Sequence, residues 1–290
     1  MRLSIVIATK NRAAFLERAL ASLESQIGAP SFEVIVADNG STDGTRGVAE
    51  AAEKRGKIAV RYLYEERANR GRARNAGVRV AQGYLVLFCD DDVAAPPGWV
   101  AAHDAAHVAG DLVVSGPIIN VPSYDERPRA TLANFSRAFF CTCNVSLPRY
   151  AFDAAGGFDE DFDLYGWEDT ELGMRLRDAG MQRRFAWDAY IWHVKPETDG
   201  ALDVEMRKTM EKARMAVRFV RKQPTQRARF AAGLHPVNVL RGKYLLPDGL
   251  LSVLAGAAST DWVPRPLRAI ARAQLLDGMY TRELVRALDE

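Results

Sequence analysis

The feature that most restricts the fold of this 290-residue chain is a repeated change from short apolar runs to segments with helical spacing. The apolar runs span residues 3–8, 32–37, 58–64 and 84–88. Helical spacing follows them at 15–23, up to about residue 55, and at 71–81. Strands that are apolar throughout, rather than at every second residue, are typical of parallel sheets buried on both faces. The alternation therefore predicts an α/β fold with a mostly parallel sheet flanked by helices.

The second half of the chain has a different pattern. Beyond Pro96-Pro97 the alternation loosens, and we expect strands at 112–115 and 139–145. From residue 201 the sequence becomes helical, beginning with an amphipathic basic helix and ending with a helix over 267–288. We therefore predict one domain at 1–200, followed by a helical region at 201–290.

Charge is divided unevenly between these two parts. Residues 1–200 carry 23 basic and 28 acidic side chains, whereas residues 201–290 carry 16 basic and 9 acidic ones. A basic surface attracts anionic partners such as lipid headgroups, a diphosphate or nucleic acid, although it can also be a solvated helix face. We expect no nucleic-acid partner, and peripheral contact of the basic C-terminal helices with an anionic membrane.

Three features bear on the compartment. Cys141 and Cys143 have a C-x-C spacing that matches no common zinc or redox motif, which favours a reducing environment. The first apolar run is too short for a signal peptide, and the apolar stretch at 244–258 is interrupted by Pro247-Asp248-Gly249. These features predict a cytoplasmic protein, with any membrane association on the cytoplasmic face. The oligomeric state is left open, and a homodimer is one alternative.

An acidic run, Asp90-Asp91-Asp92, directly follows the apolar run 84–88 and Cys89. Ligands of parallel sheets bind beyond the carboxyl ends of the strands. Adjacent carboxylates raise one another's pKa, and a cation relieves their repulsion. Magnesium or manganese held by one or two carboxylates and by phosphate oxygens is usual for a nucleotide substrate. The alternative is a solvated acidic turn.

Two further groups follow other predicted strands. Asp38 opens the loop after the second strand, where it could accept a proton from a base or ribose, or simply form an ordinary turn and helix cap. Arg72 and Arg74 are two positions apart near a helix start, so only one should face a cleft. The planar guanidinium suits a diphosphate, but either arginine could instead lie on the surface beside Glu65 and Glu66.

A second acidic pair lies at Trp167-Glu168-Asp169, where a helix begins. Carboxylates in a first turn are common caps. Beside Trp167, whose flat face could pack on a sugar, one of them could also act as a general base. His193, after an expected strand, is a metal-ligand candidate or else an ordinary histidine. His103 and His107, at i and i+4, are interpreted as helix surface because the first lacks a following glutamate.

In their order along the chain, these motifs resemble family 2 glycosyltransferases with the GT-A fold, over residues 3 to about 195. The opening strand Ile5–Arg12 is similar to the family's, although Ala8 stands where proline is usual. The resemblance implies a Rossmann-like sheet with a nucleotide-sugar half at 1–115, an acceptor half at 116–200 and a variable helical appendage at 201–290.

The resemblance also implies roles for individual residues. Asp169 would be the catalytic base, and Trp167 and Glu168 would contact the donor sugar or acceptor. Asp92, the last aspartate of a D-x-D type signature, would hold Mn²⁺ or Mg²⁺ together with His193. The nucleotide would be bound by Thr9, Asp38, Arg74, Asp90 and Asp91.

The function that this resemblance implies is inverting transfer of a sugar from a UDP-, GDP- or dTDP-sugar to a carbohydrate or lipid-linked acceptor, in polysaccharide or glycolipid biosynthesis. One alternative is a sugar nucleotidyltransferase, although the loop after the first strand lacks the glycines of such enzymes. Another is a non-catalytic metal- or nucleotide-binding module, although such a unit would end near half this length. The interpretation depends on the carboxylates at 90–92 and 168–169 facing one cleft.

Overall fold

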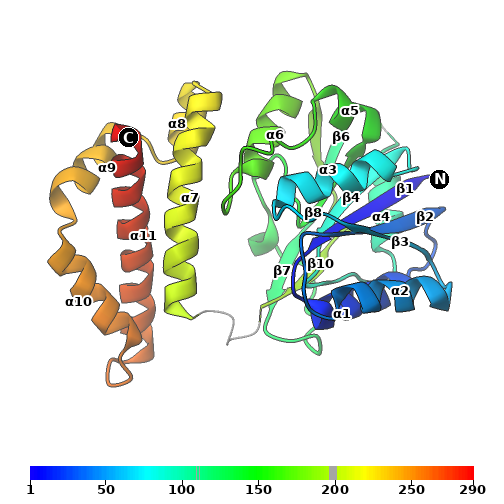
Figure 1. Cartoon of the computed structure of the whole chain (residues 1–290), viewed down its shortest axis with the longest axis horizontal. Helices are drawn as coiled ribbons and strands as arrows, with labels where there is room; N and C mark the ends of the chain where they lie inside the picture. The colour runs from blue at the N-terminus through cyan, green and yellow to red at the C-terminus, as the bar shows by residue number, and fades with distance from the viewer. Residues whose placement is uncertain (109, 111, 196–200) are drawn as a thin grey trace. The chain divides into compact units, whose positions relative to one another are not determined.

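The computed structural model describes residues 1–108, 110, 112–195 and 201–290. These residues form two compact units, which are described separately (Figure 1). The first unit comprises residues 1–163 and 168–195, and the second comprises 164–167 and 201–290. The short segment 164–167 therefore belongs to the helical unit, although the chain around it belongs to the first.

The first unit is built on a seven-stranded sheet with the order β3-β2-β1-β4-β8-β6-β9. Its strands are β1 (Leu3–Thr9), β2 (Phe32–Asp38), β3 (Ala59–Tyr64), β4 (Leu85–Asp90), β6 (Leu112–Ser115), β8 (Asn144–Pro148) and β9 (Gln182–Phe185). Only the pairings of β8 with β4 and β6 are antiparallel in this sheet as described. The predicted mostly parallel sheet is confirmed.

Helices cover both faces of this sheet, as the uninterrupted apolar strands predicted. Even- and odd-numbered strand residues point to opposite faces, so Ile5 and Ile7 pack in one buried cluster and Val6 in the other. The first cluster contains residues of α1 (Ala13–Glu24), α2 (Thr45–Arg55) and α4 (Trp99–Ala106). The second contains residues of α3 (Arg70–Val80), α5 (Arg149–Ala154) and α6 (Glu168–Asp178). Figure 1 shows α1 and α2 on one side of the sheet and α3 and α6 on the other.

A smaller sheet has the order β5-β10-β7. Its strands are β5 (Val93–Ala94), β7 (Ile118–Val121) and β10 (Ile191–Val194). Because β5 directly follows the triple aspartate, pairing of β5 with β10 brings His193 opposite Val93. The sequence had suggested that His193 follows a strand, but it lies within β10.

The strand predicted at 139–145 is wrong in its position, because the strand β8 runs over Asn144–Pro148. Phe140 instead packs its ring edge against Phe88, with 5.9 Å between the ring centroids. The backbone amide of Asn144 closes a turn by donating a hydrogen bond to the carbonyl oxygen of Cys141 at 3.1 Å. Tertiary burial of Phe140, not strand pairing, accounts for the apolar residues before β8.

The assignment of His103 and His107 to the helix surface is also wrong. Both are buried, and each has a ring nitrogen 2.8 Å from the hydroxyl of Ser146 in β8. Burial lowers the pKa of His103 to about 3 and that of His107 to about 4. Spacing at i and i+4 puts the two rings on the same face of α4, and that face is turned toward the sheet.

The second unit consists of helices. They are α7 (Leu202–Lys222), α8 (Gln226–Ala231), α9 (Pro236–Leu240), the π-helical turn η3 (Arg241–Leu245), α10 (Asp248–Ser259) and α11 (Arg265–Asp289). Ion pairs of Arg214 with Glu283 at 2.5 Å and of Arg272 with Glu205 at 2.7 Å join α7 to α11. In the described part of the chain, no helix is long and apolar enough to span a membrane.

Gly116, between β6 and β7, offers a test of how closely the backbone segments of the first unit pack. A Cβ at this position would lie 1.8 Å from the backbone carbonyl oxygen of Ala189. We expect Gly116→Ala to lower the free energy of unfolding by about 1–3 kcal/mol, because the backbone segments around Gly116 and Ala189 must move apart. Gly47→Ala, in open space on α2, should instead stabilise by up to about 1 kcal/mol. Thermal unfolding followed by circular dichroism compares the two variants, and equal stabilities would contradict the packing.

Candidate active site

Parallel pairing brings the predicted polar residues to one edge of the large sheet. Strand β1 pairs with β2 so that Thr9 lies opposite Asp38, and with β4 so that Ala8 lies opposite Asp90. The carboxyl ends of three adjacent parallel strands thus meet at one edge, where ligands of such sheets bind. The structure places Thr9, Asp38 and Asp90–Asp92 at this edge.

Asp91 is held from two sides inside this edge. Its Oδ2 accepts a hydrogen bond from Thr9 Oγ1 at 2.7 Å, and its Oδ1 accepts one from Arg12 Nη1 at 2.8 Å. Burial raises the pKa of Asp91 to about 6, against the lowering effects of Arg12 and Thr9. Because both oxygens are engaged and the residue is buried, Asp91 and Thr9 support the edge from within. Contact of these two residues with the nucleotide stays a prediction.

Arg12 is a residue whose role the sequence analysis missed. Its Nη1 lies 2.8 Å from oxygens of both Asp91 and Asp92, and its guanidinium lies over the ring of Phe15. It therefore offsets the charge of two adjacent carboxylates. The only signal in the sequence was a basic residue soon after the first strand.

Asp38 is buried, and both of its carboxylate oxygens accept hydrogen bonds. Oδ2 accepts one from the Tyr62 hydroxyl at 2.8 Å, and Oδ1 accepts one from the Ser41 amide at 2.8 Å. The Ser41 bond is the turn-forming contact that was the alternative interpretation of this loop. Base recognition by Asp38 stays a prediction.

The two arginines of α3 diverge. Arg74 is buried, and it bridges Asp90 and Glu168, with its Nη2 3.2 Å from Asp90 Oδ1 and its Nη1 3.3 Å from Glu168 Oε1. Arg72 turns the other way, to Glu65 at 2.9 Å and Glu160 at 3.3 Å. One guanidinium therefore joins the end of β4 to the start of α6. The two acidic groups, remote in sequence, lie in one site.

Asp169 follows Glu168 in the first turn of α6. Its Oδ1 accepts a hydrogen bond from the Thr170 amide at 2.6 Å. Burial and then the charge of Glu168 raise the pKa of Asp169 to about 6, although Arg74 and the Thr170 bonds act in the opposite direction. Such a carboxylate is ionised at neutral pH but is a stronger base than an ordinary aspartate.

Trp167 is a packing residue of the second unit. Its ring stacks on that of Phe219, with centroids 4.9 Å apart, and its Nε1 donates a hydrogen bond to the carbonyl oxygen of Lys212 at 2.9 Å. One ring face and the polar edge are therefore already used, which argues against the predicted contact with a sugar. Gly166 and Trp167 have φ values of 95° and 76°, and for tryptophan this left-handed conformation is strained.

His193 and Asp92 form a pair that suits a divalent cation. His193 Nε2 lies 3.1 Å from Asp92 Oδ1, and its Nδ1 lies 3.0 Å from the carbonyl oxygen of the Asn120 side chain. A divalent cation could bind between this imidazole nitrogen and the carboxylate oxygen. Histidine ligands typically donate their other N–H to a carbonyl or carboxylate in this way.

The surroundings of Asp92 support the same conclusion. Its buried Oδ1 faces the imidazole of His193 and accepts no hydrogen bond from any other group among the described residues. Burial would raise the pKa of Asp92, but His193 and Arg12 together hold it below its usual value. An ionised carboxylate beside an imidazole nitrogen is a donor set that fits Mn²⁺. Asn120, which orients His193, was not found from the sequence.

Comparison with known sequences points to one family. The model of Glycosyl transferase family 2 matches residues 4–160, and the model described as the N-terminal domain of galactosyltransferase matches residues 129–195. Validoxylamine A glucosyltransferase of Streptomyces hygroscopicus subsp. limoneus is 33% identical over an alignment of 266 positions, which covers 77% of this chain. The chain covers only 57% of the length of that relative.

Solved structures share the fold. The mannosyltransferase PcManGT from Pyrobaculum calidifontis, in complex with GDP-Man and Mn²⁺, matches 99% of this chain and 86% of its own with a TM-score of 0.65 at 19% identity. S. aureus TarS 1–349 in complex with UDP-GlcNAc matches 99% of this chain and 92% of its own, with a TM-score of 0.59 at 19% identity. The predicted GT-A architecture is confirmed by these matches.

Proposed function

The chain belongs to glycosyl transferase family 2, and from this premise we propose that it is an inverting glycosyltransferase, which moves a sugar from a nucleoside diphosphate sugar to an acceptor hydroxyl. The observation that carries the proposal is the bridge from Asp90 through Arg74 to Glu168. It joins the strand edge where a nucleotide would bind to the helix that carries a second acidic pair. A sugar held between the two would be close to both.

In the proposed reaction, Asp169 takes the proton of the acceptor hydroxyl as that oxygen attacks the anomeric carbon in a single displacement. The transition state resembles an oxocarbenium ion. Glu168, fixed by Arg74, orients the donor sugar or the acceptor. Arg74 positions Asp90 and Glu168 and lies beside the nucleotide. Asp38 contacts the base, and Asp90 contacts the ribose.

Asp92 and His193 would hold the divalent cation. When bound, that cation supplies positive charge that offsets the charge of the leaving diphosphate. The related structure of PcManGT contains Mn²⁺, which makes manganese our first choice over magnesium. Arg12 would keep Asp92 ionised in the absence of the cation.

Binding of a nucleotide sugar gives a direct test. A ligand present at about 100 times its Kd stabilises the folded state by about 2.7 kcal/mol, which raises the melting temperature by several degrees. We expect such a shift from a UDP-, GDP- or dTDP-sugar in the presence of Mn²⁺, and a smaller one with a chelator. A thermal-shift screen of these donors with and without Mn²⁺ makes the measurement. No shift with any donor would contradict the proposal.

The two rival functions give different products. A sugar nucleotidyltransferase would release pyrophosphate from a nucleoside triphosphate and a sugar phosphate, whereas the proposed enzyme would release a nucleoside diphosphate. A non-catalytic module would bind the metal and nucleotide but neither transfer nor hydrolyse the sugar. The family match and the second acidic pair favour the glycosyltransferase.

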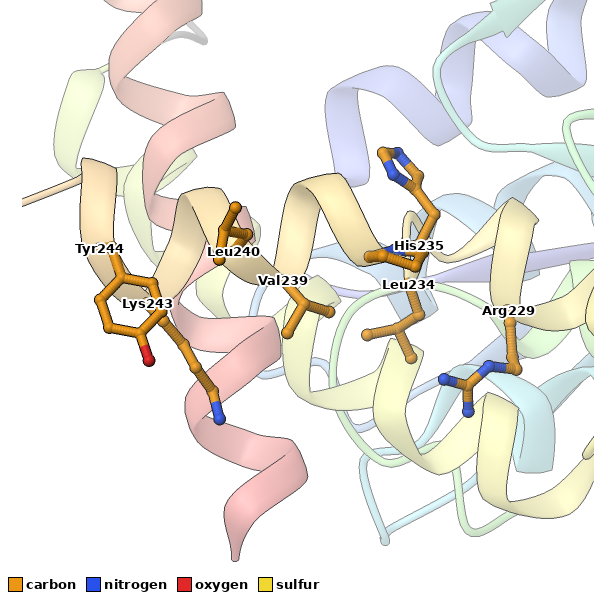
Figure 2. A pocket seen from close by; sticks show the side chains of 8 residues that line it. Arg229, Leu234, His235, Val239, Leu240, Lys243 and Tyr244 are labelled. Carbon is orange, nitrogen blue, oxygen red and sulfur yellow. The ribbon is translucent and has the colours of Figure 1, made fainter.

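We also propose that the second unit docks on an anionic membrane that displays a lipid-linked acceptor. Large apolar side chains on this unit are exposed, including Val237, Leu240, Tyr244, Leu245, Val253 and Trp262. Figure 2 shows Val239 and Leu240 on α9 and Tyr244 on η3, with Lys243 beside Tyr244. Exposed apolar and aromatic residues among basic ones are typical of helices that lie in a membrane interface.

The membrane proposal is tested with lipid vesicles. The double variant Leu240→Asp/Tyr244→Asp should lose most of its cosedimentation with vesicles that contain an anionic lipid. Leu132→Asp, at an exposed apolar position in the first unit, is the control and should bind like the unchanged protein. Absence of binding by the unchanged protein, or equal binding by both variants, would refute the proposal.

A further inference from the structure

A cysteine lies among the acidic and imidazole groups of the site, and the mechanism above gives it no role. Strands β4 and β8 pair antiparallel, with Cys89 opposite Asn144. The next residues along this pairing are Asp90 on one strand and Cys143 on the other. His193 comes from β10 in the smaller sheet. Two strand ends and a third strand therefore converge on one point.

The potential ligand atoms of these residues are close together. A carboxylate oxygen of Asp90, the Sγ of Cys143 and a ring nitrogen of His193 all lie within 4.8 Å of one another. Ligand atoms that share one ion at about 2.0–2.3 Å lie at most about 4.6 Å apart. Small side-chain movements would therefore let all three reach a single ion.

The position of Cys143 is also restrained by its burial and by the hydrogen bonds of the next residue. It is 6% exposed, and the following residue, Asn144, is anchored on both ends of its amide. Asn144 Oδ1 accepts a hydrogen bond from Trp99 Nε1 at 3.0 Å, and Asn144 Nδ2 donates one to the carbonyl oxygen of Ala189 at 2.8 Å. A preformed position lowers the entropy that ligand binding would cost.

A second observation concerns Asp92, which also lies beside His193. Asp92 Oδ1 is buried and faces His193 Nε2 at 3.1 Å, and it accepts no hydrogen bond from any other group among the described residues. His193 is thus close to two sets of donors, the carboxylate of Asp92 and the pair of Asp90 and Cys143. The oxygen-rich set suits manganese, whereas the set with sulfur suits softer ions.

We propose that Cys143, His193 and Asp90 form a binding site for a thiophilic divalent ion of the zinc, cobalt and cadmium class, which overlaps the site proposed for Mn²⁺ through the shared His193. On binding, a metal–sulfur bond forms and the S–H bond breaks, and the proton passes to the buffer, with no change of oxidation state. A soft ion held in this way excludes Mn²⁺, so micromolar zinc should inhibit. The overlap rests on the proposed function, whereas the sulfur ligation does not.

Cobalt is the spectroscopic probe, because its bond to a thiolate gives a charge-transfer band in the near ultraviolet. The full chain is freed of metal with a chelator and titrated with Co²⁺ alone. We expect the band to saturate at one equivalent in the unchanged protein. It should be absent in Cys143→Ser, whose cobalt affinity should fall by at least about 10-fold. Cys141→Ser, two residues away, is the matched control and should keep the band. A band that persists in Cys143→Ser, or that is lost only in Cys141→Ser, overturns the proposal.

Two further measurements use the unchanged protein, so the test does not depend on the folding of a variant. Cadmium NMR should give a resonance strongly shifted downfield, as sulfur ligands do, and a resonance typical of oxygen and nitrogen ligands alone would overturn the proposal. A charge-transfer band without donor stabilisation by Mn²⁺ would reject the glycosyltransferase function and retain the cysteine site. Stabilisation by a donor with Mn²⁺ but without the charge-transfer band would retain the glycosyltransferase function and reject the cysteine site.

Discussion

Replacing Asp169 with asparagine is expected to lower kcat by about 10²–10⁴-fold, the usual contribution of a general base. Asparagine keeps the shape of the side chain and an oxygen that can accept the Thr170 amide, so the first turn of α6 should persist. Donor affinity should change little, because the base acts on the acceptor. Steady-state kinetics with the donor found in the thermal-shift screen, together with calorimetry of donor binding, measure both effects.

Asp178→Asn, at an exposed position on the same helix, is the control and should leave kcat unchanged. Unchanged turnover of the Asp169 variant would remove this residue from the role of base. A large loss of donor affinity would instead assign it to donor binding.

The pH profile gives a second readout for the same residue. The pKa of Asp169 is raised to about 6, and a base must be deprotonated to act. Activity should therefore be full above this value and should fall about tenfold per pH unit below it. Glu168→Gln removes a neighbouring negative charge that helps to raise this pKa, so it should move the acid limb to lower pH. An acid limb that stays in place would assign the titration to another group.

Replacing Asp92 with asparagine is expected to abolish most of the gain in donor affinity that Mn²⁺ provides, on the order of 100-fold. Loss of a hydrogen-bond partner of a metal ligand alone costs about 10–100-fold in metal affinity, and loss of a ligand should cost at least as much. Calorimetry of nucleoside diphosphate binding with Mn²⁺ and with a chelator measures the difference.

Asp188→Asn, exposed just before β10, is the control for the Asp92 variant. Donor binding by Asp92→Asn should be weak and independent of Mn²⁺, because Arg12 still pairs with Asp91 and keeps the edge of the sheet intact. If Mn²⁺ strengthened donor binding equally in both variants, Asp92 would not be a ligand.

The sequence by itself determined the fold class and the edge at which the site lies. Uninterrupted apolar strands required helices on both faces, and the parallel arrangement put Asp38 and Asp90 at the carboxyl ends of adjacent strands. These conclusions depend on local periodicity and on general rules of sheet geometry. They need no knowledge of which distant segments meet.

The individual contacts were decided only by the tertiary structure. Insertion of β8 between β4 and β6 brings Cys143 beside Asp90, and pairing of β10 with β5 and β7 brings His193 between Asp92 and Asn120. The stacking of Trp167 on Phe219, which makes Trp167 a packing residue, was likewise visible only in the tertiary structure. The physical reason is that periodicity specifies which face of an element is buried, whereas the partner of a side chain depends on strand order and crossovers between segments far apart in the chain.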